Sequence, residues 1–233
     1  RGLPCDAAGQ LQPQDDVGNA KRFAHWGAGR IGYSHSRGWM RYTGTHWQRD
    51  DMGLAQGWAI TTASRITAEA MTLPDTTTGN EKQSAQVKMQ KWCESSRFTG
   101  RIQAMLALSQ SDPAIRLDDT KWDASPEAIN TASGLVDLRT LDVQPHHPAQ
   151  MCSRVTPGAW LGKDWKPEAS KWLDHLAFVA AGDATMPAYL QWAIGCSLVG
   201  AQRTHVVFFA FGGGGNGKGT MFRGLASAFG EYV

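Results

Sequence analysis

Apolar residues recur at spacings of three and four along much of the chain, and this period predicts a series of amphipathic helices. In the window 56–72, Ala59, Ala63, Ile66 and Ala70 share one face of the expected helix. The same reasoning predicts helices over 16–26, 81–97, 168–180 and 185–200, and one that begins with Thr99 as its cap. A break is expected at Thr77-Thr78-Gly79-Asn80.

Shorter runs rich in aromatic and β-branched residues predict strands between these helices. Residues 31–33 are expected to form one strand, and residues 38–50 a β-hairpin with a tight turn at Thr43-Gly44. Residues 134–143 are expected to form a further strand, which Pro145-His146-His147-Pro148 ends.

The predicted hairpin carries Trp39, Tyr42 and Trp47, whose rings could meet across its strands. These rings could form a platform on which nucleic-acid bases stack, with Arg41 and Arg49 beside the phosphates, or they could form a small core. A basic face on the helix expected over 81–97 leaves a similar choice between nucleic-acid contact and a solvated surface. Its members are Lys82, Lys88, Lys91 and Arg97.

The most specific pattern lies near the end of the sequence. The continuous apolar run His205–Phe211 predicts a buried strand, and Met221, Leu225 and Phe229 predict a helix that Gly230 ends. Between them stands Gly-x-x-x-x-Gly-Lys, the spacing of a phosphate-binding loop. The simpler alternative is a flexible glycine turn.

The chemistry of triphosphate binding explains these residue types. Backbone N–H groups must wrap the phosphates, so side chains have to be absent where the chain comes close, and the following helix directs its positive end at them. Lys218, the expected catalytic residue, would reach the β- and γ-phosphates. The expected ATP-binding residues are Gly212, Gly213, Gly214, Gly215, Asn216, Gly217, Lys218, Gly219 and Thr220.

The position after the lysine, where a hydroxyl normally binds Mg²⁺, is occupied by Gly219. Either Thr220 supplies the hydroxyl from the next position, or water and the phosphates hold the metal ion. Thr220 is therefore the expected magnesium ligand from the protein.

Composition narrows the class of protein. The chain has 233 residues, a net charge of +2 and 42% hydrophobic residues, which fits one or two globular domains and no membrane span. Its four cysteines lack zinc-binding spacing, and they favour reduced thiols in the cytoplasm. Pro157-Gly158 and Pro167 indicate a boundary between an accessory domain, 1–165, and a second domain, 166–233. We also expect the chain to be a fragment, because a phosphate-binding loop needs a surrounding sheet and a later acidic strand.

With these residues in view, the chain resembles the phage- and plasmid-encoded primase–helicase family, whose motor belongs to helicase superfamily three. The block from Leu190 to Val233 carries the most specific similarity: Leu190-Gln191 with Gly195, Leu198 and Gly200, then Gly214-Gly215-Asn216-Gly217-Lys218, then Phe229-Gly230-Glu231-Tyr232. Upstream, the order of three weaker motifs is similar to the domain that precedes the motor: Gly18-Asn19-Ala20 with Arg22, the Trp39–Gly44–Trp47 hairpin, and Gly134 with Asp137-Leu138-Arg139-Thr140.

The resemblance implies an α/β protein, in which an α+β accessory domain precedes the first strand, phosphate loop and helix of an AAA+-like parallel-sheet ATPase. It implies an ATP-dependent DNA helicase that uses ATP and Mg²⁺. Members form rings, often hexamers, on single-stranded DNA at a replication fork, here in the cytoplasm of a bacterial host or a virus-infected cell. The family's acidic metal-binding pair and arginine finger are expected after Val233, so this fragment alone is expected to be inactive.

Two departures from the family pattern are Gly219 and Ser133, the latter at a position where Asn is common. Two alternatives stay open. The chain could belong to another P-loop NTPase such as a small-molecule kinase, although about 200 residues precede its loop. It could instead be a DNA-binding or loading module whose loop is structural, which Gly219 favours and which would bind DNA through 1–165 without responding to ATP.

Overall fold

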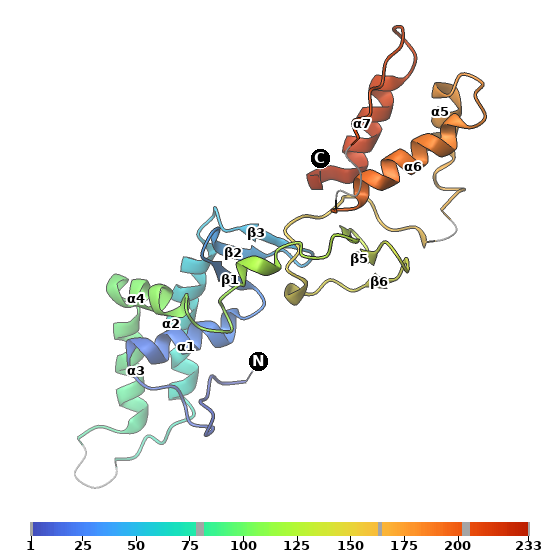
Figure 1. Ribbon diagram of the computed structural model, residues 1–233. Coiled ribbons are helices and arrows are strands. Elements are labelled where there is room, and N and C mark those ends of the chain that lie inside the picture. Colours follow the sequence, from blue (N-terminus) through green and yellow to red (C-terminus); the bar gives the residue numbers. More distant parts are fainter. Residues whose placement is uncertain (1, 78–81, 163–164, 202–205, 233) are drawn as a thin grey trace. The chain divides into compact units, whose positions relative to one another are not determined.

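The chain contains α-helices and two small antiparallel sheets, and its contacts divide it into two units (Figure 1). The computed structural model describes residues 2–77, 82–162, 165–201 and 206–232. Unit 1 contains the residues up to Thr43 and Trp47–Thr120, and unit 2 contains Gly44–His46 and the residues from Lys121 on. The fold thus has the predicted mixed α and β character, while the domain boundary near 157–166 stays a prediction.

Unit 1 packs four helices beside a three-stranded sheet of order β1-β2-β3. The elements are α1 (Asp16–Gly27), β1 (Ile31–Ser34), β2 (Gly38–Tyr42), β3 (Trp47–Arg49), α2 (Leu54–Ala70), α3 (Ala85–Ser96) and α4 (Thr99–Ser109), followed by the short 3₁₀ helix η1 (Asp119–Lys121). The predicted apolar face of α2 is confirmed, because Ala59, Ala63, Ile66 and Ala70 are all fully buried. The small side chains of the three alanines let α1, α3 and α4 pack closely against it.

Two helix starts differ from the sequence prediction. α3 begins at Ala85 rather than near Glu81, because the Ser84 hydroxyl accepts a hydrogen bond from Val87 N at 3.2 Å and caps the helix. Glu81 and most of the expected break at 77–80 lie outside the described residues. Thr99 is the first residue of α4 and not its cap; Phe98 takes the cap position, without a side-chain hydrogen bond.

The hairpin forms as predicted, but its loop is longer. Tyr42 pairs with Trp47, so four residues, Thr43 to His46, connect the strands instead of a tight turn. The rings of these two residues contact each other with centroids 5.4 Å apart, and Trp47 is only 3% exposed. Trp39 instead contacts Tyr33 and the buried Phe23. Trp47 is buried, and the half-buried Trp39 and Tyr42 pack against other rings, which favours the core interpretation over a stacking platform.

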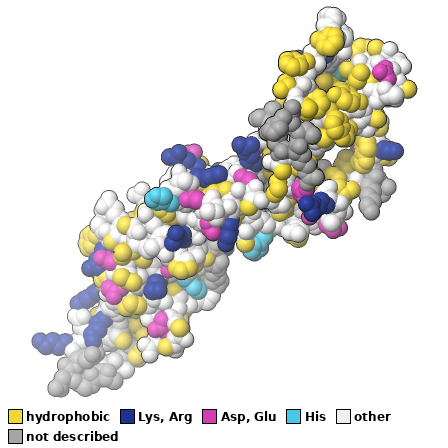
Figure 2. Space-filling view, in the orientation of Figure 1, with side chains coloured by type: hydrophobic (Ala, Val, Ile, Leu, Met, Phe, Trp, Pro, Cys, Tyr) yellow, Lys and Arg dark blue, Asp and Glu magenta, His cyan; other side chains and the backbone are white. Residues whose placement is uncertain are grey.

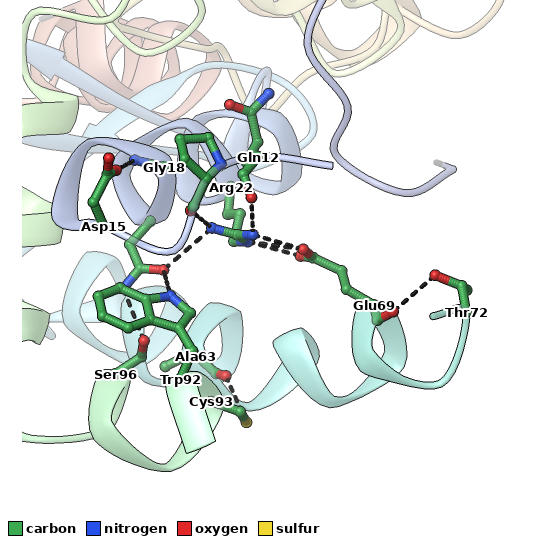
Figure 3. A network of polar contacts seen from close by, with 12 residues as sticks. Gln12, Asp15, Gly18, Arg22, Ala63, Glu69, Thr72, Trp92, Cys93 and Ser96 are labelled. Atoms are coloured by element: carbon green, nitrogen blue, oxygen red, sulfur yellow. Dashed lines mark hydrogen bonds and ion pairs between the residues drawn. The ribbon is translucent and has the colours of Figure 1, made fainter. Parts of the chain in front are cut away.

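A buried ion pair joins α1 to α2 (Figure 3). The Arg22 guanidinium donates to both carboxylate oxygens of Glu69 at 2.8–3.0 Å, and it also donates to the carbonyls of Gln12 at 2.5 Å and Pro13 at 2.7 Å. Arg22 is 0% exposed and Glu69 is 1% exposed. These bonds fix the segment before α1 against the two helices, because a buried guanidinium must satisfy its donors within the protein.

In its described residues, unit 2 contains a second three-stranded sheet, three α-helices and two short 3₁₀ helices. Its elements are β4 (Ala128–Thr131), β5 (Gly134–Asp137), β6 (Val143–Gln144), η2 (Pro148–Gln150), α5 (Ser170–Val179), α6 (Met186–Leu198), α7 (Lys218–Phe229) and η4 (Gly230–Tyr232). The strand predicted over 134–143 is really two antiparallel strands. The Asp137 side chain accepts hydrogen bonds from the N–H groups of Arg139 and Thr140, and this turn separates β5 from β6.

The strand predicted at His205–Phe211 is not formed over its described part, 206–211. A strand exists through its hydrogen bonds to a neighbour, and no strand pairs with this segment in the described part of the chain. The run is instead exposed, up to 92% at Phe211, and the Phe208 ring contacts Tyr189 and Trp192 of α6. Figure 2 shows hydrophobic side chains gathered over this part of the molecule.

None of the helices within the described ranges is long and apolar enough to cross a membrane.

Candidate functional site

The candidate site is the glycine-rich loop and the start of α7, where the predicted residues come together. α7 begins at Lys218, with Gly217 as its cap residue and Met221 N bonded to the Gly217 carbonyl at 3.0 Å. Its predicted end is confirmed, because Gly230 is the C-cap. The loop thus delivers the chain directly into a helix N-terminus, as the phosphate-binding pattern requires.

Two glycines of the loop are required by its backbone. Gly212 has φ +151°, and a Cβ there would lie 2.4 Å from Asn216 Nδ2. Gly217 has φ +82°, and a Cβ there would lie 3.0 Å from ring and methyl carbons of His175 and Val179 on α5. Any larger residue at either position would strain the backbone and collide with its neighbours.

Lys218 closes the loop on itself. Its ammonium donates to the carbonyls of Gly212 at 3.0 Å and Gly213 at 3.3 Å, and to Asn216 Oδ1 at 2.8 Å. These acceptors are neutral, so they orient the ammonium but do not neutralise its charge. The lysine is thereby held inside the loop with its positive charge available to an anion.

The N-terminus of α7 has no side-chain cap. The first N–H groups of a helix have no partner within the helix, and together with the helix dipole they attract anions. Here the absence of a capping side chain leaves those groups facing the loop.

A cavity of about 580 Å³ lies over this helix start. Its lining consists of the nine predicted ATP-binding residues, Gly212 to Thr220, together with His175, Phe178 and Arg223. Arg223 donates to the Thr220 hydroxyl at 3.3 Å. None of the described lining residues is acidic, and two are cations, so the cavity suits an anionic ligand.

Three lining residues were missed by the sequence reasoning. Arg223 lies one turn after Gly219 on the predicted helix, so helical spacing could have found it. His175 and Phe178 lie one turn apart on α5 and reach the loop only through the packing of α5 against α7. No pattern in the sequence links them to the loop.

The residues fit phosphate better than they fit a metal ion. The Thr220 hydroxyl is the one oxygen-bearing side chain besides the Asn216 amide among the described lining residues. In the described part of the chain, no group of three His, Cys, Asp or Glu side chains lies close enough to hold a metal ion. Binding of Mg²⁺ through Thr220 therefore stays a prediction.

Comparison with known protein families gives one match. The family described as "D5 N terminal like" matches residues 20–192, which include most of unit 1, the sheet of unit 2 and the start of α6. The match ends before Gly212, so it does not extend to the loop. No curated protein matches the sequence.

Proposed function

The chain belongs to the D5 N-terminal-like family, which is associated with primase–helicase proteins, and we propose that its glycine-rich loop binds the phosphates of ATP for a DNA helicase. In this proposal residues 1–165, most of which the family match covers, are the accessory part of the protein, and the ATPase domain, residues 166–233, contains the loop and α7. ATP hydrolysis and unwinding belong to the intact protein. The intact protein would assemble as a ring, on the hexameric pattern of the resembled family, around single-stranded DNA.

The observation that carries the proposal is the uncapped start of α7, with Lys218 fixed beside it by three loop oxygens. Backbone N–H groups of Lys218, Gly219 and Thr220 would hold the phosphate oxygens. Lys218 would exchange its bonds with the Gly212 and Gly213 carbonyls for bonds to the phosphates. That exchange is favourable because an ion pair between an ammonium and a phosphate is stronger than a hydrogen bond to a neutral carbonyl.

Magnesium, when bound with ATP, would neutralise charge on the phosphates. From this chain, the Thr220 hydroxyl would be its ligand, with water completing the coordination. Arg223, which donates to that hydroxyl, would hold Thr220 in place and add a second positive charge beside the phosphates.

The exposed apolar run at 206–211 supports the same proposal. Phe208, Phe209 and Phe211 face solvent in a segment that leads directly into the loop. A contiguous exposed patch of this kind marks a surface that a partner covers. We propose that this run is the first strand of the parallel ATPase sheet in the intact protein.

The test is binding of a fluorescent ATP analogue, with Mg²⁺, to the wild-type chain, to Lys218→Ala and to the control Lys171→Ala. Lys171 is exposed on α5 and does not line the cavity. Lys218→Ala should abolish binding, whereas the control should bind like the wild type. Equal ATP affinity for wild type and Lys218→Ala would refute the proposal.

The alternatives predict other outcomes in the longer protein. ATP binding by a monomer that is indifferent to single-stranded DNA would favour the small-molecule kinase. DNA binding without any response to ATP would favour the loading module with a structural loop. Ring formation in the presence of ATP, with hydrolysis stimulated by single-stranded DNA, would support the helicase.

A further inference from the structure

Two arginines lie over two tryptophan rings where α1 and α2 meet in unit 1. The Arg65 guanidinium lies 4.8 Å from the centroid of the Trp26 ring and 5.5 Å from that of Trp58, and the Arg30 guanidinium also lies 5.5 Å from the Trp58 ring. Both guanidinium groups therefore share one indole ring. We name these four residues the Arg–Trp cluster.

The cluster is held on rigid elements. Trp26 is in the last turn of α1, and Trp58 and Arg65 are on α2. Arg30 follows α1 directly; its N–H donates to the Gly27 carbonyl at 2.9 Å, and its own carbonyl accepts from Tyr42 N at 2.8 Å. Arg30 is exposed, and the other three side chains are half-buried. The rings thus support the guanidinium groups from below while leaving them accessible to solvent.

The charge of the cluster is not neutralised by carboxylates. Among the residues that the structure describes, neither Arg30 nor Arg65 forms an ion pair. The carboxylate one helical turn beyond Arg65 is Glu69, which is buried and bonded to Arg22. The surrounding sequence is also poor in acidic residues: residues 17–49 contain six Lys or Arg and no Asp or Glu, and residues 50–68 contain only two acidic residues, Asp50 and Asp51.

Two other arginines of unit 1 differ in this respect. Arg101 also lies over a tryptophan ring, at 4.0 Å from the centroid of Trp92, but it pairs with Asp16 at 3.3 Å. On the hairpin, Arg49 pairs with Asp51. Stacked arginines without a carboxylate partner therefore distinguish the Arg–Trp cluster from the hairpin, where the sequence suggested a nucleic-acid platform.

We propose that the Arg–Trp cluster is a binding site for single-stranded DNA that is separate from the nucleotide loop. The N–H groups of a guanidinium lie in one plane, so a guanidinium held over an indole ring can donate two parallel hydrogen bonds to phosphate oxygens. Two such groups over one ring would bind successive phosphates of one strand. The edges of the indole rings beside them would contact the unstacked bases.

The choice of a single strand over a duplex rests on the function proposed above, whereas the preference for a phosphate polyanion rests on the cluster itself. The half-buried indole rings also favour a single strand, because bases in a duplex are stacked on one another, whereas unstacked bases can contact the rings. Binding at this site requires no ATP.

The test is fluorescence anisotropy of a labelled oligo-deoxythymidine with the whole chain, in the absence of nucleotide. Arg30→Gln with Arg65→Gln should weaken binding at least tenfold and lower the slope of log affinity against log salt by about 0.7 for each phosphate that the variant no longer binds. The matched control is Lys91→Gln with Arg97→Gln, which removes the same charge from exposed positions on α3 and at its C-cap and should change affinity less than twofold.

A second variant distinguishes binding by the arranged Arg–Trp cluster from unspecific attraction by positive charge. Trp58→Leu removes the ring under both guanidinium groups and leaves the net charge unchanged, so it should also weaken binding severalfold. If Trp58→Leu fails to fold, Trp58→Phe keeps the apolar packing, and it should bind more weakly than the wild type because a phenyl ring attracts a cation less than an indole does.

Equal losses for the two double variants would overturn the proposal in favour of unspecific charge, and unchanged binding by Arg30→Gln with Arg65→Gln would overturn it directly. So would tighter binding to anionic lipid vesicles than to the oligonucleotide. Lys218→Ala should keep wild-type DNA affinity in this assay. A failure of ATP binding at the loop and a failure of DNA binding at the Arg–Trp cluster are therefore distinguished by separate measurements.

Discussion

Replacement of Arg22 by Met should destabilise unit 1 more than any exposed charge replacement. The side chain loses an ion pair with Glu69, and the carbonyls of Gln12 and Pro13 lose their donor. Breaking a buried pair from one side costs about 3–5 kcal/mol, because the remaining charge stays buried without a partner. Loss of the two backbone hydrogen bonds adds about 1 kcal/mol each before relaxation. We therefore expect a loss of at least about 4 kcal/mol in the free energy of unfolding.

The assay is amide hydrogen exchange of α1 and α2, read by mass spectrometry, because it reports the stability of unit 1 without assuming that both units unfold together. A loss of about 4 kcal/mol corresponds to exchange faster by nearly three orders of magnitude. The control is Arg49→Met, which removes an ion pair whose side chains are 76% and 78% exposed. That change should cost at most about 1 kcal/mol.

A companion variant tests the cause of this loss. Arg22→Met with Glu69→Leu removes both charges, so it should recover a large part of the stability that Arg22→Met loses. The reasoning would be refuted if Arg22→Met left the exchange of α1 and α2 within tenfold of the wild type. It would also be refuted if the double variant were less stable than Arg22→Met alone.

Three further predictions concern unit 2. Gly219→Ser should fold normally, because a Cβ there would lie 3.6 Å from its nearest neighbour, Arg223 Nη1. The variant should make ATP affinity depend more strongly on Mg²⁺, and an unchanged Mg²⁺ titration would contradict a ligand role for this position. Burial raises the pKa of the Cys152 thiol to about 11, so iodoacetamide should label it far more slowly than the exposed Cys5 at pH 8, as peptide mass mapping can check. Hydrogen bonds from Thr185 lower the pKa of Asp183, so the stabilisation of the α6 N-terminus by this carboxylate should be complete above the ordinary carboxyl pKa of about 4 and should be lost as the pH falls through the lower folded-state pKa. The loss should be measured as faster hydrogen exchange of the first α6 amides, and Asp183→Asn should remove this pH dependence.

Local patterns of the sequence predicted most of the helices and the glycine-rich loop. The period of Ala59, Ala63 and Ile66 located α2 and its buried face, and Met186-Pro187 located the start of α6. Helices of this kind follow from local information, since their hydrogen bonds and facing side chains join residues three or four apart. The loop was predictable for the same reason, because its function depends on consecutive residues.

Errors arose where a distant partner decides the local structure. The run 206–211 has the composition of a buried strand but forms none, because strand formation depends on a neighbouring strand and not on composition. By contrast, the core interpretation of the hairpin rings, one of the two that the sequence allowed, agrees with the contact of Trp39 with Phe23 of α1, which no local pattern contains.

The sequence by itself determined the helical periods, the glycine spacing that ends in Lys218, and the resemblance to primase–helicases, all of which are properties of neighbouring residues. Only the tertiary structure decided that His175 and Phe178 complete the cavity over the loop, and that Arg30 and Arg65 share the Trp58 ring. Such sites join residues from different elements, so they exist only once packing has fixed the distances between those elements.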